Sequence, residues 1–402
     1  MADIAIPYGA YWSTPFARWQ GSLAHLHSLR FGAYVTRRML AQRQIDPAAI
    51  DFGVLGTTVP QRSAFYGLPW LMAEAGLPHV AGPTINQACA TGARILQVAA
   101  AEVAAGDASV ALAVAADRIS NGPHLYYPAP HGPGGTGEHE DWVLDNFEKD
   151  PFAGAAMVQT AENVAAAHDI DTARQNELTL CRYEQYHEAL ANDSAFLRRF
   201  MVLPFAVPDA RFKRTQSEMS GDEGIFPTTA EGLAKLKPVL PGGTVTFGGQ
   251  THPADGNAGI VITTAEKARE LSVDPAIQIR VVGFGQARVK PAFMPMAPVP
   301  AAQRALQAAG LTVADLTAIK THNPFIVNDC YMADQLGIDA TRFNRFGCSL
   351  VWGHPQGPTG LRAVIELIEE LVIRGGGYGL FTGCAAGDSA MAVIVEVKDG
   401  RA

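Results

Sequence analysis

The sequence TGARILQVAAAEVAAGDASVALAVAAD, at residues 91–117, follows the same pattern as TGLRAVIELIEELVIRGGGYGLFTGCAAGD, at residues 359–388. Each stretch opens with Thr-Gly-x-Arg, continues with apolar residues at helical spacing, and turns at glycine into an apolar run typical of a buried strand. The two align without a gap at an offset of 268 residues, from Thr91 to Thr359. Only a few aligned positions are identical, so chance similarity is the alternative to an internal duplication. With the alternation of helical and strand-like runs elsewhere, the pattern predicts an α/β layered fold.

The region between the two stretches has a different composition. It is richer in Pro, Gly, His and charged residues, and HLYYPAPHGPGGTGEHEDW (residues 124–142) is predicted to lack regular structure. Helical periodicity returns at residues 159–170 and 172–193, and residues 211–240 indicate a loop followed by a short helix.

This change of composition predicts three units. An inserted loop or lid subdomain would lie over two core halves and complete a substrate site. The predicted bounds are 1–119 plus 250–272 for the N-terminal half, 120–249 for the insert, and 273–402 for the C-terminal half.

The overall composition is that of an ordinary globular protein. Of 402 residues, 48% are hydrophobic and 17% are charged, and the net charge of −8 disfavours nucleic acid as the main partner. We find neither a signal-peptide pattern nor an apolar run of about 18 residues that would span a membrane. The five cysteines show no CxxC pair and no Cys/His metal spacing. We therefore expect a cytoplasmic protein with reduced thiols and no bound metal.

Cys89 is the first candidate for chemistry. In INQACATGARIL (residues 85–96) it follows a predicted strand end and precedes a Thr-Gly turn into a helix. The helix dipole and free backbone N–H groups at such a position lower the pKa of a thiol and favour the thiolate nucleophile. The alternative is a buried apolar cysteine, which is the commoner state of a lone cysteine.

Three more candidates stand at predicted turns. His354 lies between Gly and Pro just before a helix, which suits a general base, or else it is an ordinary loop histidine. Cys384 follows an apolar strand among small residues, and His322 follows another strand, where an imidazole can donate to a developing oxyanion. Each of the two has a purely structural alternative, but with Cys89 the set supplies a nucleophile, its base, a second thiol and an oxyanion donor. The cysteines that we expect only to pack are Cys181, Cys330 and Cys348.

On these residues, the sequence resembles the thiolase family over nearly its whole length. The resemblance implies a duplicated five-layer α/β/α/β/α core with an inserted loop subdomain. The stretches that carry it are STPFARWQGSLA (13–24), NQACATGARIL (86–96), MVQTAENVA (157–165), LAKLKPVLPGGTVTFGGQTHPADGNAG (233–259), GHPQGPTGLR (353–362) and GCAAGDSAMAVIVE (383–396).

The resemblance also implies an acyltransferase that cleaves or forms the carbon–carbon bond of a 3-oxoacyl-CoA. Cys89 would carry the acyl group, His354 would activate it, and Cys384 would move the proton on the α-carbon. The backbone N–H groups of Cys89 and Ala386 would form one oxyanion hole, and His322 with His354 would form the other.

Several positions depart from the family pattern. His322-Asn323-Pro324-Phe325 replaces the Asn-Glu-Ala-Phe of many thiolases, and the Cys-x-Gly motif is Cys-Ala-Ala-Gly, so that Ala386 supplies the oxyanion N–H. We therefore expect retained chemistry on an unusual bulky, branched or aromatic acyl group, such as a benzoylsuccinyl-type CoA ester.

Further residues are expected to contact the acyl group or CoA. Thr251 takes the place of a pantetheine-contacting Ser, and Arg211 and Arg214 flank Lys213 in the most basic short cluster of the insert. A solvated surface turn is the alternative for this cluster. The full expected set is Met157, Thr251, Phe325, Gly387, Arg211 and Arg214.

CoA is expected as a substrate, with no tightly bound cofactor. The resemblance implies a homodimer or a dimer of dimers. The alternatives are a thiolase-like subunit active only with a small OB-fold, zinc-containing accessory protein, a ketoacyl-synthase-like condensing enzyme, and a Cys-His hydrolase that needs no CoA.

Overall fold

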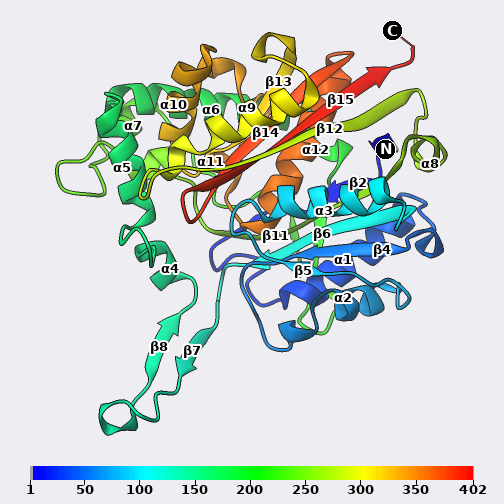
Figure 1. The fold of residues 1–402 in the computed structure, drawn as a ribbon, viewed down its shortest axis with the longest axis horizontal. Coiled ribbons are helices and arrows are strands. Elements are labelled where there is room, and N and C mark those ends of the chain that lie inside the picture. Colours follow the sequence, from blue (N-terminus) through cyan, green and yellow to red (C-terminus); the bar gives the residue numbers. More distant parts are fainter. Residues whose placement is uncertain (1–2, 402) are drawn as a thin grey trace.

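The computed structural model describes residues 3–401, which fold around one large mixed sheet (Figure 1). Its 11 strands follow the order β13-β14-β15-β12-β1-β11-β6-β4-β5, and β2 and β3 also pair with β11. The strands are β1 (Ile4–Ile6), β2 (Tyr11–Ser13), β3 (Ala17–Arg18), β4 (Phe52–Gly56), β5 (Thr84–Ile85), β6 (Val110–Arg118), β11 (Ala254–Thr264), β12 (Ile277–Arg288), β13 (Leu316–His322), β14 (Gly376–Ala385) and β15 (Ser389–Asp399).

The sheet consists of two halves with the same pattern. In the N-terminal half β4 runs parallel to β6, which pairs antiparallel with β11. In the C-terminal half β13 runs parallel to β14, which pairs antiparallel with β15. The halves join where β1 pairs antiparallel with β12. The strands of the two repeated stretches, β6 and β14, therefore hold equivalent places, as the duplicated pattern predicts.

Helices form three layers around the two halves. The middle layer is α3 (Thr91–Ala105) and α12 (Gly357–Ile373), which pack against strands of both halves. One outer layer is α1 (Ser28–Gln42) and α2 (Gly67–Ala75). The other contains α9 (Pro298–Ala309), with α10 (Ile326–Leu336) packed against it. The predicted five-layer α/β/α/β/α core is therefore confirmed. The remaining core helices are α8 (Ala265–Leu271) and α11 (Ser349–Trp352).

The two Thr-Gly-x-Arg motifs meet in the middle layer. A Cβ atom on Gly92 would lie 2.7 Å from the Gly357 carbonyl oxygen and 2.7 Å from the Leu361 nitrogen. A Cβ atom on Gly360 would lie 3.0 Å from the Ala93 nitrogen. Glycine is required on both helices because their backbones touch here. This contact brings the start of α3 next to the start of α12.

The segment between β6 and β11 is folded throughout most of its length. It contains α4 (Leu144–Glu148), α5 (Met157–Ala167), α6 (Thr172–Ser194), α7 (Ala230–Ala234), β7 (His124–Tyr127), β8 (Glu138–Asp141), β9 (Phe205–Pro208) and β10 (Thr215–Met219). The expectation that residues 124–142 lack regular structure is wrong. β7 and β8 form an antiparallel hairpin that projects from the body (Figure 1), because the Pro and Gly residues are confined to the loop at its tip.

Buried ion pairs tie this segment to the core. Arg182 of α6 contacts Asp329 of α10 at 2.9 Å, and Arg362 of α12 contacts Asp222 at 2.6 Å, with all four side chains fully buried. Breaking a buried pair costs about 3–5 kcal/mol because it leaves a desolvated charge without a partner. The insert is therefore fixed to the two helices that adjoin the site described below. Within residues 3–401, no helix has the length and apolar content needed to cross a bilayer.

Candidate active site

Cys89 lies in a tight turn that leads into α3. Ala88 adopts the left-handed conformation, with φ of 45°. The Thr91 hydroxyl accepts the Gln87 N–H at 2.8 Å and donates to the Ala88 carbonyl at 2.7 Å, which closes the turn around the cysteine. The thiol is half-buried at the helix N-terminus, as the sequence predicts.

Two histidines from the C-terminal half face each other beside this turn. His322 ends β13 and His354 follows α11, and their rings stack with centroids 4.0 Å apart. The outer nitrogen of each ring is held by a hydroxyl: His322 Nδ1 lies 2.8 Å from Ser349 Oγ, and His354 Nδ1 lies 2.7 Å from Thr359 Oγ1. Both rings are buried, and their Nε2 atoms have no hydrogen-bond partner among the described residues.

These groups converge on Cys89. The Cys89 Sγ and one ring nitrogen from each of His322 and His354 lie within 4.8 Å of one another. Cys89 is more than 200 residues away from both histidines in the sequence, so only the fold brings the three side chains together. The structure thus assembles three of the four predicted catalytic side chains in one cluster.

Cys384, the fourth, ends β14 and is fully buried. Its Sγ accepts a hydrogen bond from Asn328 Nδ2 of α10 at 3.2 Å. Burial raises the pKa of Cys384, and the charge of the Cys89 thiolate raises it further, which places the two thiols within electrostatic reach of each other.

The electrostatics of Cys89 differ from the sequence prediction. The backbone N–H groups of Ala386 and of Cys89 itself hydrogen-bond to its sulfur and lower the pKa, as expected for an oxyanion-hole position. Burial outweighs them and raises the pKa of Cys89 to about 11. The expectation of a lowered pKa is therefore wrong for the free thiol, because desolvation of the thiolate exceeds what the helix N-terminus supplies.

Both histidines are held neutral. Burial lowers the pKa of His322 to about 3. Burial, together with the neighbouring His322, lowers the pKa of His354 well below its usual value. The thiol can give its proton to a neutral imidazole. The two charges that result then lie side by side as an ion pair.

Three of the expected substrate-contacting residues, Thr251, Phe325 and Gly387, adjoin the segments that carry His322 and Cys384. Thr251 donates its N–H to the Pro324 carbonyl at 2.8 Å, and its hydroxyl is already used by the Ser349 carbonyl. Phe325 is buried, and its backbone forms an antiparallel β-bridge with Gln250, the residue before Thr251. Met157 is half-buried at the first position of α5, and Gly387, with φ of +77°, forms the turn after Ala386.

The basic cluster of the insert has other neighbours. Arg211 and Arg214 are exposed in the turn between β9 and β10. Phe212, between them, packs against Tyr34 of α1, with ring centroids 5.5 Å apart. The structure therefore places this turn on the outer helix layer and gives it no described contact with the cysteines or histidines of the cluster.

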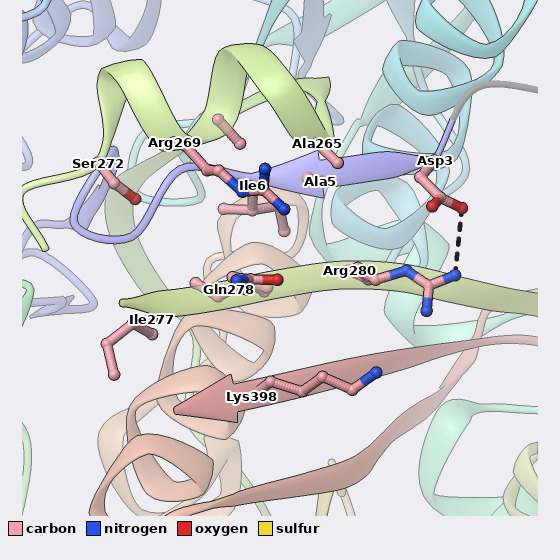
Figure 2. Close-up of a pocket in the computed structure, with 12 residues that line it drawn as sticks. Asp3, Ala5, Ile6, Ala265, Arg269, Ser272, Ile277, Gln278, Arg280 and Lys398 are labelled. Atoms are coloured by element: carbon pink, nitrogen blue, oxygen red, sulfur yellow. Dashed lines mark hydrogen bonds and ion pairs between the residues drawn. The ribbon is translucent and has the colours of Figure 1, made fainter. Parts of the chain in front are cut away.

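Four positioning residues are missed by the sequence reasoning: Ser349, Thr359, Asn328 and Asp117. The buried Asp117 carboxylate, whose pKa burial raises to about 6, accepts the Gly357 N–H at 3.0 Å and the Thr58 N–H at 2.7 Å, so it links the start of α12 to the loop after β4. Thr359 opens the second Thr-Gly-x-Arg motif, and the only sequence signal for the other three is a polar residue type in or beside an apolar run. The pocket in Figure 2, about 210 Å³ in volume and lined by Asp3, Arg280 and Lys398 among others, contains none of the cluster.

Comparison with known proteins agrees with the geometry. Residues 10–266 match the thiolase N-terminal domain family, and residues 276–397 match the thiolase C-terminal domain family. The chain belongs to the thiolase family. It is thus an acyltransferase of acyl-CoA metabolism, and CoA is the substrate that thiolases share.

Curated relatives cover almost the whole thiolase chain. The acetyl-CoA acetyltransferase of Allochromatium vinosum is 31% identical over 94% of this chain and 95% of its own length. The beta-ketothiolase BktB of Cupriavidus necator is 30% identical over 95% of this chain and 96% of its own.

Solved structures show the same fold. Human mitochondrial 3-ketoacyl-CoA thiolase in complex with CoA superposes with a TM-score of 0.87 at 26% identity, covering 98% of both chains. The Bacillus anthracis acetyl-CoA acetyltransferase gives a TM-score of 0.88 at 26% identity, covering 99% of both chains.

Proposed function

We propose that this thiolase performs CoA-dependent cleavage of a 3-oxoacyl-CoA, or the reverse condensation, through an acyl intermediate on Cys89. The single observation that carries the proposal is the convergence of the Cys89 thiol with the two neutral imidazoles of His322 and His354. A nucleophile, its base and an oxyanion donor are the parts that acyl transfer requires.

In the first step the Cys89 sulfur attacks the 3-oxo carbonyl. His354 Nε2 accepts the thiol proton. Its lowered pKa keeps the ring neutral beforehand, and donation from Nδ1–H to Thr359 Oγ1 leaves Nε2 as the free acceptor. The thiol therefore loses its proton to the imidazole at the moment of attack. The free enzyme does not need to form a thiolate beforehand, so the raised pKa of the free thiol does not prevent the reaction.

Negative charge on the carbonyl oxygens needs donors. The backbone N–H groups of Cys89 and Ala386 already point at the sulfur and supply one oxyanion hole. His322 supplies the other: Ser349 Oγ lies 2.8 Å from its Nδ1 and, as donor to that nitrogen, leaves the proton on Nε2.

Cys384 moves the proton of the α-carbon. In cleavage its thiol protonates the enolate that departs as acetyl-CoA or an analogue, and the resulting thiolate takes a proton back when free CoA attacks the acyl group on Cys89. Asn328 Nδ2 stabilises this thiolate from 3.2 Å. Two thiols are needed because one is covalently occupied while the other exchanges the proton.

The finer proposal is that the acyl group is bulky, branched or aromatic, as in a benzoylsuccinyl-type CoA ester. The motivation is two exposed aromatic side chains on segments that lead to residues in contact with the cluster. Phe226 is 71% exposed and follows Gly224, which lies against His252, the residue whose carbonyl accepts the His354 N–H at 2.9 Å. Phe247 is 73% exposed, just before the segment of Thr251. Exposed rings of this kind are suited to cover an apolar ligand.

The test is an assay of CoA-dependent cleavage over short linear, long linear, 2-branched and aromatic 3-oxoacyl-CoAs, with Cys89→Ala as the inactive control. Preference for the branched or aromatic members supports the full proposal. Equal turnover of acetoacetyl-CoA and larger esters contradicts the proposed bulky acyl group but supports the proposed thiolase reaction. Release of free acid without CoA indicates a hydrolase, and activity that appears only with a co-purified small chain indicates the accessory-protein alternative.

A further inference from the structure

The three converging groups are also a donor set for a metal ion. His322 and His354 each present a buried Nε2 that no described residue satisfies, and their Nδ1 atoms are fixed by Ser349 and Thr359. A second hydrogen bond on the outer nitrogen is the usual support of a metal-ligating histidine, since it fixes the ring. Cys89 Sγ completes a set within 4.8 Å.

The chemistry of this set favours one class of cation. Thiolate and imidazole are ligands of Zn²⁺, which binds sulfur at about 2.3 Å and nitrogen at about 2.0 Å in a tetrahedron. Ligand atoms in such a tetrahedron are about 3.5 Å apart. The three ligand atoms lie within 4.8 Å of one another, so each pair would have to approach by little more than 1 Å at most to reach this geometry. Hard cations such as Mg²⁺ need carboxylate or carbonyl oxygens, so they fit this set poorly.

We propose that Cys89, His322 and His354 form an inhibitory site for Zn²⁺ or a similar borderline-soft divalent cation, with the fourth position open to water. Binding is a ligation without electron transfer. The Cys89 thiol loses its proton to solvent and a sulfur–metal bond forms. The His322 proton moves from Nε2 to Nδ1, where Ser349 Oγ accepts it, so that both imidazoles bind as neutral ligands through Nε2. A chelator reverses the process.

The site excludes acyl transfer while it is filled. The sulfur that would attack the carbonyl is bound, and the two histidines lose the lone pair or proton that the reaction uses. Conversely, an acylated Cys89 has no thiolate to offer, so substrate and cation compete. The titratable groups that face the Cys89 sulfur are the two histidines, Cys384 and Asp117.

The sequence does not show this site because its ligands have no metal-binding spacing. Cys89 comes from the N-terminal half and both histidines come from the C-terminal half, and the contact of α3 with α12 brings the halves together here. The sequence therefore predicts no metal site, whereas the geometry supports a reversible inhibitor site.

The first test is Co²⁺ titration of the full chain without substrate. We expect one equivalent to give thiolate-to-cobalt charge transfer and the intense visible bands of tetrahedral Co²⁺. Cys89→Ser should abolish the charge transfer, and His322→Gln should weaken binding by about 10–100-fold. Two matched controls should bind as the parent does: Cys181→Ser, a half-buried cysteine on α6, and His124→Gln with His139→Gln, a stacked surface pair on the β7–β8 hairpin.

A second test needs no variant. In the unaltered protein, Zn²⁺ should protect Cys89 from alkylation by iodoacetamide, as measured by peptide mass, and a chelator should restore alkylation. Cobalt spectra unchanged by Cys89→Ser, or alkylation unaffected by saturating Zn²⁺, would overturn the site. Neither readout requires turnover, so the failure of the proposed function would not be mistaken for the failure of this proposal.

Discussion

The two thiols of the site sit in contrasting surroundings. Cys89 is half-buried at the start of α3 and receives backbone N–H groups, whereas Cys384 is fully buried at the end of β14 and receives a side-chain amide from Asn328. The backbone donors beside Cys89 can stabilise negative charge on the sulfur and then on the oxygen of a carbonyl bound next to it. The partial exposure of Cys89 leaves room for an acyl group. A buried thiol with one amide donor can only exchange a proton over a short distance. Because both residues are cysteines, their surroundings, not their residue type, distinguish the nucleophile from the acid/base.

The two thiols are also coupled. The charge of a Cys89 thiolate raises the pKa of Cys384, so ionisation of one thiol disfavours ionisation of the other. Acylation converts Cys89 into a neutral thioester and removes that charge. Cys384 therefore becomes easier to ionise at the stage when it has to act as a base.

The largest expected effect is that of Cys89→Ala. Cleavage should fall by about 10⁴-fold or more, because no covalent intermediate can form. The intact mass of the protein after incubation with an acyl-CoA should show no acyl adduct. An adduct in this variant would show that another residue is the nucleophile, which would contradict the division of roles between Cys89 and Cys384.

Cys384→Ser should be nearly as slow in cleavage and condensation, with a loss of about 10²–10⁴-fold for a removed acid/base. It should differ from Cys89→Ala in one respect: the acyl adduct on Cys89 should still form from a simple acyl-CoA. The check is intact mass together with exchange of the acetyl-CoA α-protons in D₂O. Lost adduct formation with normal folding would show that the two thiols do not divide the work as proposed.

Asn328→Ala should have an intermediate effect that separates the two thiols further. Loss of a donor to the Cys384 thiolate raises its pKa, so α-proton exchange should slow by about 10-fold to 100-fold and its pH limb should move upward. Acylation of Cys89 should change little. Asn328→Gln is the matched conservative variant, and Asn163→Ala, on α5, is a control that removes an amide bonded elsewhere. Equal slowing of both half-reactions would indicate a merely structural role.

The fold was predictable because its signals are local. Helical spacing, the Gly turns and the Thr-Gly-x-Arg motifs at Thr91 and Thr359 are all visible in single stretches, and glycine at positions 92 and 360 has a physical reason in the helix contact. The hairpin at residues 124–142 was missed because its strands are short and pair only with each other.

The site was predictable only in part. Cys89, His354, Cys384 and His322 stand in recognisable motifs, but most of the residues that hold them do not. Ser349, for example, precedes His354 by five positions yet supports His322. The pKa direction of Cys89 was also mistaken, since helix position can be read from sequence while burial depends on the whole fold.

The pH dependence of acylation tests the neutral histidines. A group whose folded pKa is lowered stays unprotonated until the pH falls below that value, so His354 should remain a competent base as pH drops through 6.5. The rate of Cys89 acylation, measured by rapid quench between pH 7.5 and 5.5, should therefore show no histidine limb near 6.5 in these conditions. A tenfold fall centred near 6.5 would show that the imidazole is protonated in the usual range and that burial does not control it.

The smallest expected effect is that of Ser349→Ala, and it depends on a tautomer. Ser349 Oγ accepts the Asn323 N–H at 3.1 Å and has two acceptors for its own proton, His322 Nδ1 at 2.8 Å and Asn323 Oδ1 at 3.2 Å. The shorter contact favours donation to His322, which leaves Nε2–H aimed at the oxyanion. Alanine would release the ring and let it donate from Nδ1 instead. We expect kcat to fall by about tenfold with KM little changed, since only charge development is affected, and Ser349→Thr should restore most of the loss. A change in KM alone would mean that the hydroxyl shapes the pocket and leaves the tautomer of His322 unaffected.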